Sequence, residues 1–445
     1  MLKWSSLFED LISRVTEIGE TMISSNVNES LIDKCIKLLT STGEATGLAR
    51  SREILDGYKA LNDEQQLAFF QSMQEQLGVD TEKLKKAVLQ WNQNPGDKEA
   101  RNIHFASEPR TQELIRRLNR ASGGTASLVK MRQDLLAHIK THADLGSVDE
   151  DFKHLFNSWF NRGFLTLEVI NWSTSADILE KIITYEAVHK IDGWNDLRRR
   201  VAEKDRRLYA FFHPALPSEP LIFVEVALMN DVPQTMDEIL SPERQRISPF
   251  NANMAVFYSI SNCQVGLKGI SFGNFLIKQV VEELRRELPN LKRFITMSPV
   301  PSLCHWANNN NEIAPDMAQT VAQMEDCPPL PSADFKQNMQ TKLGHLASYY
   351  LLQAKNKHGQ PYDPVSRFHL GNGARLEQIN FWADTSEKGI KTSWSIMVNY
   401  EYDLRSIEQN HEAFVSKGVI STSSTVKKML PKKRDHHSLI GEKNV

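Results

Sequence analysis

A strand, a glycine turn and a helix follow one another directly in the second half of the chain. Residues 255–260 form an apolar run rich in β-branched and aromatic side chains, which predicts a buried strand. Gly266 and Gly269 come next, and apolar residues then recur at four-residue spacing up to Leu288, which predicts an amphipathic helix. A glycine turn between a strand and a helix can point backbone N–H groups at a phosphate. This order of elements favours an α/β domain and suggests a phosphorylated ligand.

The composition is that of an ordinary globular protein. The chain has 445 residues, which allows two or three domains, and its formal net charge is −2. The body of the sequence has no basic domain or stripe of the kind that binds nucleic acid. No apolar run reaches the ~18 residues that a membrane-spanning helix needs. We therefore expect neither nucleic acid nor a membrane as a partner.

The N-terminus and the cysteines favour a cytoplasmic protein. The first ten residues lack the apolar core of a signal peptide, and their acidic residues argue against an organellar transit peptide. The four cysteines are widely spaced and form no Cys-x-x-Cys pair. We expect no disulfide framework and no metal site.

Hydrophobic periodicity divides the chain into a helical part, a mixed part and a tail. Residues 1–160 are predicted to form amphipathic helices, which we interpret as a packing or oligomerisation domain. Residues 161–417 are predicted to form a mixed α/β domain, and residues 418–445 a disordered tail rich in Ser, Thr and Lys. The predicted fold class is α+β, an all-α bundle followed by a mixed α/β domain. Within the second domain we expect strands at 164–170, 208–212, 221–228, 292–297 and 392–402, a surface loop at 230–250, helices at 305–360 and a turn at 369–373.

The glycine turn is the first candidate site. Gly266 and Gly269 permit positive φ and close approach of an anion to the main chain. Lys268 and Lys278 lie in and after the turn and could add positive charge. The spacing differs from the dinucleotide fingerprint and from the phosphate loop of nucleoside triphosphatases, so neither NAD nor ATP is supported. A plain turn between strand and helix explains the two glycines equally well.

The turn and several other segments resemble one enzyme family. Gln-x-Gly-x-x-Gly after a strand is similar to the pyrophosphate-binding turn of GNAT-type N-acetyltransferases, whose ligand is coenzyme A. The wider sequence, over roughly residues 100–405, resembles the malonyl-CoA decarboxylase family. The segments that carry this resemblance are 159–164, 186–189, 257–278, 297–301, 368–374 and 380–384.

The resemblance implies a helical N-terminal domain and an acetyltransferase-like catalytic domain that acts on malonyl-CoA without cofactor or metal. It also implies a homotetramer, and the lack of a C-terminal Ser-Lys-Leu peroxisomal signal agrees with a bacterial, cytoplasmic member. Ser271 stands where some animal members carry an acidic residue, so a serine–histidine–acid relay is not expected. The implied substrate-binding residues are Gln264, Gly266, Lys268, Gly269, Ile270, Ser271, Phe272, Gly273 and Asn274.

The resemblance also implies two catalytic residues. Ser298 ends a predicted strand and precedes Pro299, which favours extended geometry, and the pattern alone fits a hydroxyl that caps a turn. In the family, the serine of Ser-Pro-x-Pro is an active-site residue and the histidine of Phe-His-Leu-x-Asn-Gly is the proton donor, which implies these roles for Ser298 and His369. A histidine with a pKa of about 6.5 suits proton delivery to a thioester enolate. Ser298 would contact the substrate carboxylate or the enolate and form a hydrogen bond to His369.

Two other functions fit parts of the pattern. An acyltransferase could use the same coenzyme A turn, with Glu225 as its general base, although a solvent-facing strand residue is the simpler interpretation of Glu225. A coenzyme A-sensing protein with a degenerate site is disfavoured, because Ser298 and His369 both stand within their motifs. Release of CO2 that requires an added amine would indicate the acyltransferase.

Overall fold

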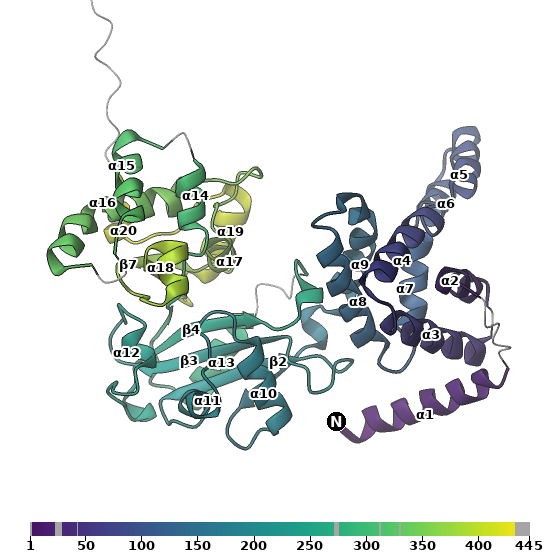
Figure 1. Cartoon of the computed structure of the whole chain (residues 1–445), viewed down its shortest axis with the longest axis horizontal. Coiled ribbons are helices and arrows are strands. Elements are labelled where there is room, and N and C mark those ends of the chain that lie inside the picture. Colours follow the sequence, from purple (N-terminus) through teal and green to yellow (C-terminus); the bar gives the residue numbers. More distant parts are fainter. Residues whose placement is uncertain are drawn as a thin grey trace, which may run out of the picture. The chain divides into compact units, whose positions relative to one another are not determined.

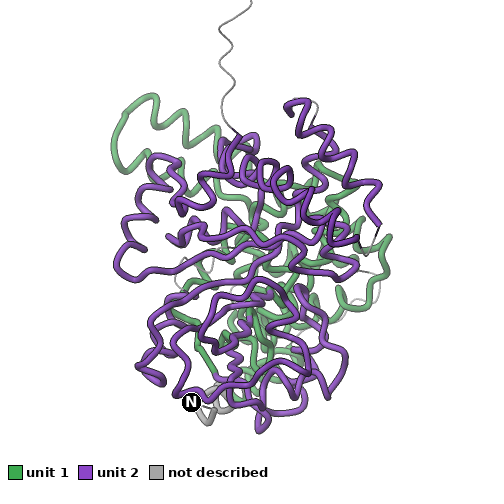
Figure 2. Tube along the Cα trace, turned by 90° about the vertical axis from the view of Figure 1, so that its left-hand side faces the viewer, with its two compact units in different colours: residues 1–168, 210–222, 262–273 green, residues 169–209, 223–261, 274–445 purple. Residues whose placement is uncertain are grey.

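The chain folds into two compact units, which Figure 2 shows in different colours. The computed structural model describes residues 2–22, 29–41, 43–270, 276–310, 313–328 and 331–431. Unit 1 comprises residues 1–168, 210–222 and 262–273, and unit 2 comprises residues 169–209, 223–261 and 274–445. Unit 1 therefore contains two segments that the sequence analysis placed in the second domain.

Unit 1 is built on a bundle of helices, coloured purple to blue in Figure 1. Leu128, Met131 and Leu135 lie on one face of their helix and are fully buried, as their spacing predicts. The predicted helical N-terminal part is confirmed. None of the described helices is long and apolar enough to cross a membrane. The elements are α1 (Leu2–Glu20), α2 (Leu31–Thr40), α3 (Glu44–Lys59), α4 (Asp63–Gln76), α5 (Thr81–Gln93), α6 (Asp97–Ala106), α7 (Arg110–Leu118), α8 (Gly124–His138), η1 (Ala143–Leu145), α9 (Gly146–Trp159) and η2 (Arg162–Phe164).

Two further segments complete unit 1. Residues 262–273 carry the glycine turn, which includes the short 3-10 helix η4 (Val265–Leu267). Residues 210–222 lie beside this segment, since the Cys263 N–H donates a hydrogen bond of 2.9 Å to the Leu221 carbonyl. The turn therefore belongs to the same compact unit as the helical bundle.

A mixed eight-stranded sheet lies mainly in unit 2, in the order β1-β2-β3-β4-β5-β8-β6, with β7 also paired to β8. β4 and β5 run parallel, with Val256 opposite Ile295, and β8 runs antiparallel to β5, β6 and β7. Such a parallel pair needs a crossover, which α13 (Leu276–Glu287) supplies. The strands are β1 (Thr166–Ile170), β2 (Arg206–Phe212), β3 (Ile222–Met229), β4 (Met254–Asn262), β5 (Arg293–Thr296), β6 (Ser298–Pro299), β7 (Arg375–Asn380) and β8 (Met397–Glu401).

The rest of unit 2 is largely helical, and the whole confirms the α+β class. The segment 369–373, predicted as a turn, instead begins inside a helix, and the predicted loop at 230–250 contains one helical turn. The other helices of unit 2 are α10 (Ala176–Tyr185), α11 (Trp194–Val201), α12 (Asp237–Leu240), α14 (Leu303–Asn309), α15 (Pro315–Glu325), α16 (Ala333–Leu352), α17 (Pro364–Gly371), α18 (Glu387–Ser393), α19 (Ile407–Lys417) and α20 (Ser424–Lys428).

The disordered tail expected from residue 418 onward is wrong for residues 418–431. The Leu376 N–H donates to the Ser421 carbonyl and the Ser423 N–H donates to the Leu376 carbonyl, each at 2.9 Å. The side chain of Val426 is fully buried. This segment is ordered by its hydrogen bonds to β7 and by the buried side chain of Val426. The composition of the segment reveals neither feature. Residues 432–445 lie outside the described residues.

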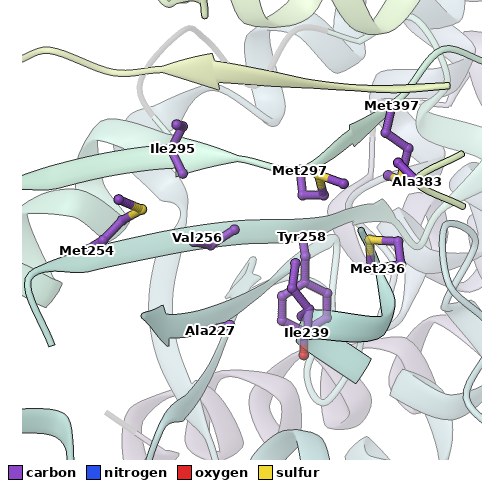
Figure 3. Packing of buried hydrophobic residues seen from close by; sticks show 10 residues of the cluster. All are labelled: Ala227, Met236, Ile239, Met254, Val256, Tyr258, Ile295, Met297, Ala383 and Met397. Atoms are coloured by element: carbon purple, nitrogen blue, oxygen red, sulfur yellow. The ribbon is translucent and has the colours of Figure 1, made fainter. Parts of the chain in front are cut away.

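A cluster of buried side chains ties the sheet to α12 (Figure 3). Met254, Val256 and Tyr258 alternate along β4, so they point to the same face of the sheet. They pack with Ile295 of β5 and with Ile239 of α12, and all five side chains are at most 1% exposed. This packing fixes β5, and β5 leads directly into the strand that carries Ser298.

Candidate active site

Ser298 and His369 lie in contact inside unit 2. The Ser298 Oγ is 3.1 Å from the His369 Nε2, and the two residues are 4% and 3% exposed. Ser298 begins β6 and lies opposite Val398 of β8. His369 lies in the last turn of α17, which starts where the Asp363 carboxylate accepts hydrogen bonds from the backbone N–H groups of residues 365 and 366. The structure thus brings together the two residues that the motifs predict.

The hydrogen bonds around His369 favour the tautomer that carries its proton on Nε2. Ser298 donates its hydroxyl proton to the Thr296 Oγ1 at 2.8 Å, which leaves the Ser298 Oγ to accept from the His369 Nε2. The Tyr402 hydroxyl lies 2.8 Å from the His369 Nδ1. If Nε2 carries the proton of a neutral ring, Nδ1 accepts from Tyr402. The result is a chain of hydrogen bonds from Tyr402 through His369 and Ser298 to Thr296.

Burial keeps the ring of His369 neutral. Removal from water lowers the pKa of His369 to about 3, so the uncharged imidazole is the form present at neutral pH. The ring also stacks on Tyr400, with centroids 4.6 Å apart and planes inclined by 22°. The expectation of a pKa near that of a free histidine is therefore wrong, because the sequence does not show how deeply His369 is buried.

Tyr400 contacts both Thr296, where the chain of hydrogen bonds ends, and the helix that carries His369. Its backbone N–H donates to the Thr296 Oγ1 at 3.1 Å, and its hydroxyl lies 2.7 Å from the Ser366 Oγ of α17. Tyr400 therefore connects β8, β5 and the helix that carries His369. Thr296, Tyr400 and Tyr402 were not found by the sequence analysis. An alternating Tyr-x-Tyr on a predicted strand is the signal that was available, and it does not differ from an ordinary buried strand.

The two glycines of the turn, which lies in unit 1, are required for different reasons. A Cβ atom on Gly266 would lie 1.9 Å from the Val129 carbonyl oxygen of α8, so only glycine fits this close approach. Gly269 has φ +79° and is exposed, and a Cβ atom there would meet nothing within 4 Å. Glycine permits positive φ at both positions, and of the two only Gly269 adopts it. The close approach at Gly266 is to protein backbone.

The side chains of the turn have separate surroundings. The Gln264 amide donates to the Pro220 carbonyl at 3.3 Å, so it supports the neighbouring segment of unit 1. Lys268 is exposed and Ile270 is buried. Lys278, on α13, pairs with Glu408 at 2.6 Å. The other four predicted binding residues, Ser271, Phe272, Gly273 and Asn274, lie outside the described residues.

Arg132 contacts the turn from the helical bundle and was missed by the sequence analysis. Its guanidinium donates to the carbonyl oxygens of Gly266 and Lys268, at 2.6 Å and 3.0 Å. Its side chain is fully buried and pairs with Asp149. A signal was present, because position 132 is four residues after Leu128 and three before Leu135, on the buried face of the helix.

Glu225 is not solvent-facing, so the simpler interpretation of this residue is wrong. It is fully buried on β3, and its carboxylate lies 3.2 Å from an Arg200 nitrogen. Burial raises the pKa of Glu225 to about 7, against the opposing effect of Arg200. A buried, ion-paired carboxylate does not lie open to an acceptor amine, so the structure offers no support for the acyltransferase base.

Comparisons with known proteins agree with the motifs. A serine hydroxyl hydrogen-bonded to a buried, neutral histidine is an arrangement of groups that can transfer a proton. The model of the malonyl-CoA decarboxylase C-terminal domain matches residues 163–440, and that of the N-terminal domain matches residues 77–160. The chain therefore belongs to the malonyl-CoA decarboxylase family.

Individual relatives support this assignment. The mitochondrial malonyl-CoA decarboxylase of the goose Anser anser anser is 33% identical over 355 residues, which cover 73% of this chain and 70% of that protein. The crystal structure of malonyl-CoA decarboxylase from Rhodopseudomonas palustris has 49% identity and a TM-score of 0.86, covering 89% of this chain and 98% of that one. The Agrobacterium vitis structure has 47% identity and a TM-score of 0.85, covering 90% of this chain and 100% of that one.

Proposed function

We propose that this chain converts malonyl-CoA to acetyl-CoA and CO2. The observation that carries the proposal is the buried Ser298–His369 pair, with its ring held neutral, in a chain of the malonyl-CoA decarboxylase family. Relatives from goose and mouse bear the name of this activity.

The chemistry requires little more than orientation and a proton. Loss of CO2 leaves an electron pair on the α-carbon, which the thioester delocalises onto its oxygen as an enolate. The thioester is itself the electron sink, so the reaction needs no added cofactor. The protein must hold the carboxylate out of the enolate plane, stabilise the negative oxygen and protonate the carbon.

We assign the proton to the His369 Nε2–H. A thioester enolate is a stronger base than the anion of imidazole, so a neutral ring can supply this proton, which water later restores. The Tyr402 hydroxyl, 2.8 Å from Nδ1, stabilises the negative charge that develops on the ring. Neutral histidines act as hydrogen-bond donors in other enzymes that form enolates.

Ser298 is assigned to the enolate oxygen. Its Oγ lies 3.1 Å from the nitrogen that gives up the proton, and the thioester oxygen is two bonds from the carbon that receives it. Rotation of the Ser298 O–H from Thr296 to this oxygen places a donor where charge develops. We assign the glycine turn, with the exposed Gly269, to the pyrophosphate of coenzyme A.

Assembly and location are part of the same proposal. Val88, Leu89, Trp91 and Phe105 are large apolar side chains that stay exposed on α5 and α6. We assign this surface to self-association, which the family resemblance gives as a tetramer, and light scattering of wild type against Leu89→Glu tests it. The four cysteines are unpaired, which fits a cytoplasmic, reducing compartment.

Purified protein tests the activity directly. Malonyl-CoA alone, without added metal, biotin or nucleotide, is expected to yield CO2 and acetyl-CoA in equal amounts. The variant His369→Ala provides the control for contaminating activity. If CO2 appears only when an amine acceptor is present, the chain is an acyltransferase and the proposal fails.

A further inference from the structure

Arg132 is a fully buried cation within the helical bundle of unit 1. Its Nε donates to the Asp149 Oδ1 at 2.8 Å, and Lys153 lies 2.6 Å from the other oxygen of the same carboxylate. Burial of a guanidinium is costly unless its donors are used. One carboxylate satisfies one edge of Arg132, and the remaining donors need acceptors.

Those acceptors are backbone carbonyls of the glycine turn. Nη1 donates to the Gly266 oxygen at 2.6 Å and Nη2 to the Lys268 oxygen at 3.0 Å. Both carbonyls therefore point into the helical bundle. The close packing of Gly266 on Val129 holds the turn at the same place.

The direction of a carbonyl fixes the direction of the next N–H. In a planar trans peptide, the C=O of Lys268 and the N–H of Gly269 point in opposite directions. Because Arg132 draws the carbonyl inward, the Gly269 N–H points away from the bundle. This N–H donates to no atom among the described residues, and Gly269 is exposed with open space on its Cβ side. By contrast, the Leu267 N–H is used within the turn, by the Gln264 carbonyl.

We propose that Arg132 is a positioning residue for the anion-binding turn, through the Gly266 and Lys268 carbonyls that it holds. It aims the Gly269 N–H at a phosphate group of the ligand. Together with Lys153 it also leaves net positive charge behind the turn, because Asp149 balances only one of the two cations. This inference rests on the proposed assignment of the turn to coenzyme A.

Arg117 offers a matched control in the same unit. It also pairs with a carboxylate, Glu113, and donates to two carbonyls, those of Leu38 and Ser41. Its side chain is 27% exposed. The kinds of partner are the same, but the two carbonyls belong to the C-terminal end of α2 and not to the glycine turn.

The test compares Arg132→Lys and Arg132→Met with Arg117→Lys and Arg117→Met in the full chain. We expect the Arg132 variants to raise KM for malonyl-CoA and Kd for coenzyme A by ~10-fold or more, the size of a lost charge-assisted hydrogen bond. Their kcat is expected to stay within about threefold of wild type, since uniform binding is lost and the chemical step is not. The Arg117 variants are expected to change none of these constants. Amide hydrogen exchange at residues 265–270 is expected to be faster in the Arg132 variants only.

The outcomes separate this inference from the proposed activity. Unchanged Kd and KM in a folded Arg132→Met protein overturn the positioning role. If Arg132→Met does not fold, Arg132→Lys decides, because one ammonium cannot donate to both carbonyls and Asp149 in the forked geometry of arginine. Binding of coenzyme A needs no turnover. Suppose that the wild-type protein binds coenzyme A, that the Arg132 variants weaken this binding, and that no CO2 is released. This result overturns the decarboxylase proposal and leaves the positioning role of Arg132 intact.

Discussion

At the scale of single residues, burial gives His369 a protonation state that also affects folding. Because burial lowers its pKa from 6.5 to about 3, the unfolded chain binds more protons than the folded chain between these values. The stabilising contribution of the neutral ring is therefore fully present above pH 6.5 and is lost as the pH falls toward 3.

This sign leads to the first prediction, on stability. Compared with His369→Gln, the wild-type free energy of unfolding is expected to fall more steeply with acid, by up to ~1.4 kcal/mol per pH unit. Denaturant titrations at about pH 7, 6 and 5 measure the two slopes. Burial also lowers the pKa of His189, to about 4, but His189 is present in both proteins and cancels in the difference. Equal slopes would mean that His369 is not held neutral in the fold.

The second prediction concerns turnover. His369→Gln is expected to lower kcat by ~10²-fold or more, because it removes the group that supplies the proton. His213→Gln is the matched control, since His213 lies in unit 1, where its Nε2 contacts the Trp159 carbonyl at 3.2 Å. Steady-state kinetics of both variants on malonyl-CoA give the comparison. Near-normal turnover in His369→Gln would remove this residue from the mechanism.

The sequence predicts what a local motif determines about these residues, and it does not predict what contacts between distant segments determine. The pairing of Ser298 with His369 was predictable, because both stand in motifs of a known family. The neutral state of His369 was not, since it arises from β8, β6 and α17 meeting around the ring. Arg132 was missed for the same reason, because its acceptors at Gly266 and Lys268 are more than a hundred residues away along the chain.

At the scale of elements, the glycine turn needs close packing at Gly266 and an exposed backbone N–H at Gly269. This difference gives the third prediction. Gly266→Ala is expected to lower stability by ~1–3 kcal/mol, because its Cβ would meet the Val129 backbone at 1.9 Å, as in an overpacked core. Gly269→Val has space for its side chain, but φ +79° strains a β-branched residue, so this variant is also expected to lose stability. Unlike Gly266→Ala, it is expected to raise KM as well, because the added bulk shields the exposed N–H. Thermal unfolding and steady-state kinetics on both variants test the distinction. An unchanged KM in Gly269→Val would contradict the assignment of Gly269 to ligand binding.

Elements with a clear hydrophobic pattern were predictable from the sequence. Short elements, and those whose order depends on distant partners, were not. β4 follows from its run of apolar, β-branched and aromatic residues, and α13 follows from the four-residue stripe. The end of α17 was missed because Gly371 and Gly373 are typical of turns. The segment around Val426 was missed because its order depends on hydrogen bonds to Leu376, and a composition rich in Ser and Lys does not reveal such a partner.

At the scale of the whole molecule, unit 1 contains two short segments that come from further along the chain. A boundary near residue 160 follows from the change in periodicity, and unit 1 does continue to residue 168. It also includes residues 210–222 and 262–273. Arg132 and Val129 contact the second of these segments, and in the first the His213 Nε2 lies 3.2 Å from the Trp159 carbonyl oxygen. Composition along the chain cannot show this arrangement, because it does not tell which unit a segment packs against.

The contribution of these two segments to unit 1 leads to the last prediction. Residues 1–168 alone are expected to be less stable than unit 1 in the full chain, since Arg132 would lose both carbonyl acceptors, and unsatisfied buried donors cost ~1–3 kcal/mol. Arg132→Met is expected to destabilise the full chain more than the fragment, because in the fragment only the pair with Asp149 is left to lose. Urea unfolding of the four proteins completes this cycle. An equal effect of Arg132→Met in both contexts would mean that the glycine turn contributes nothing to the stability of the helical bundle.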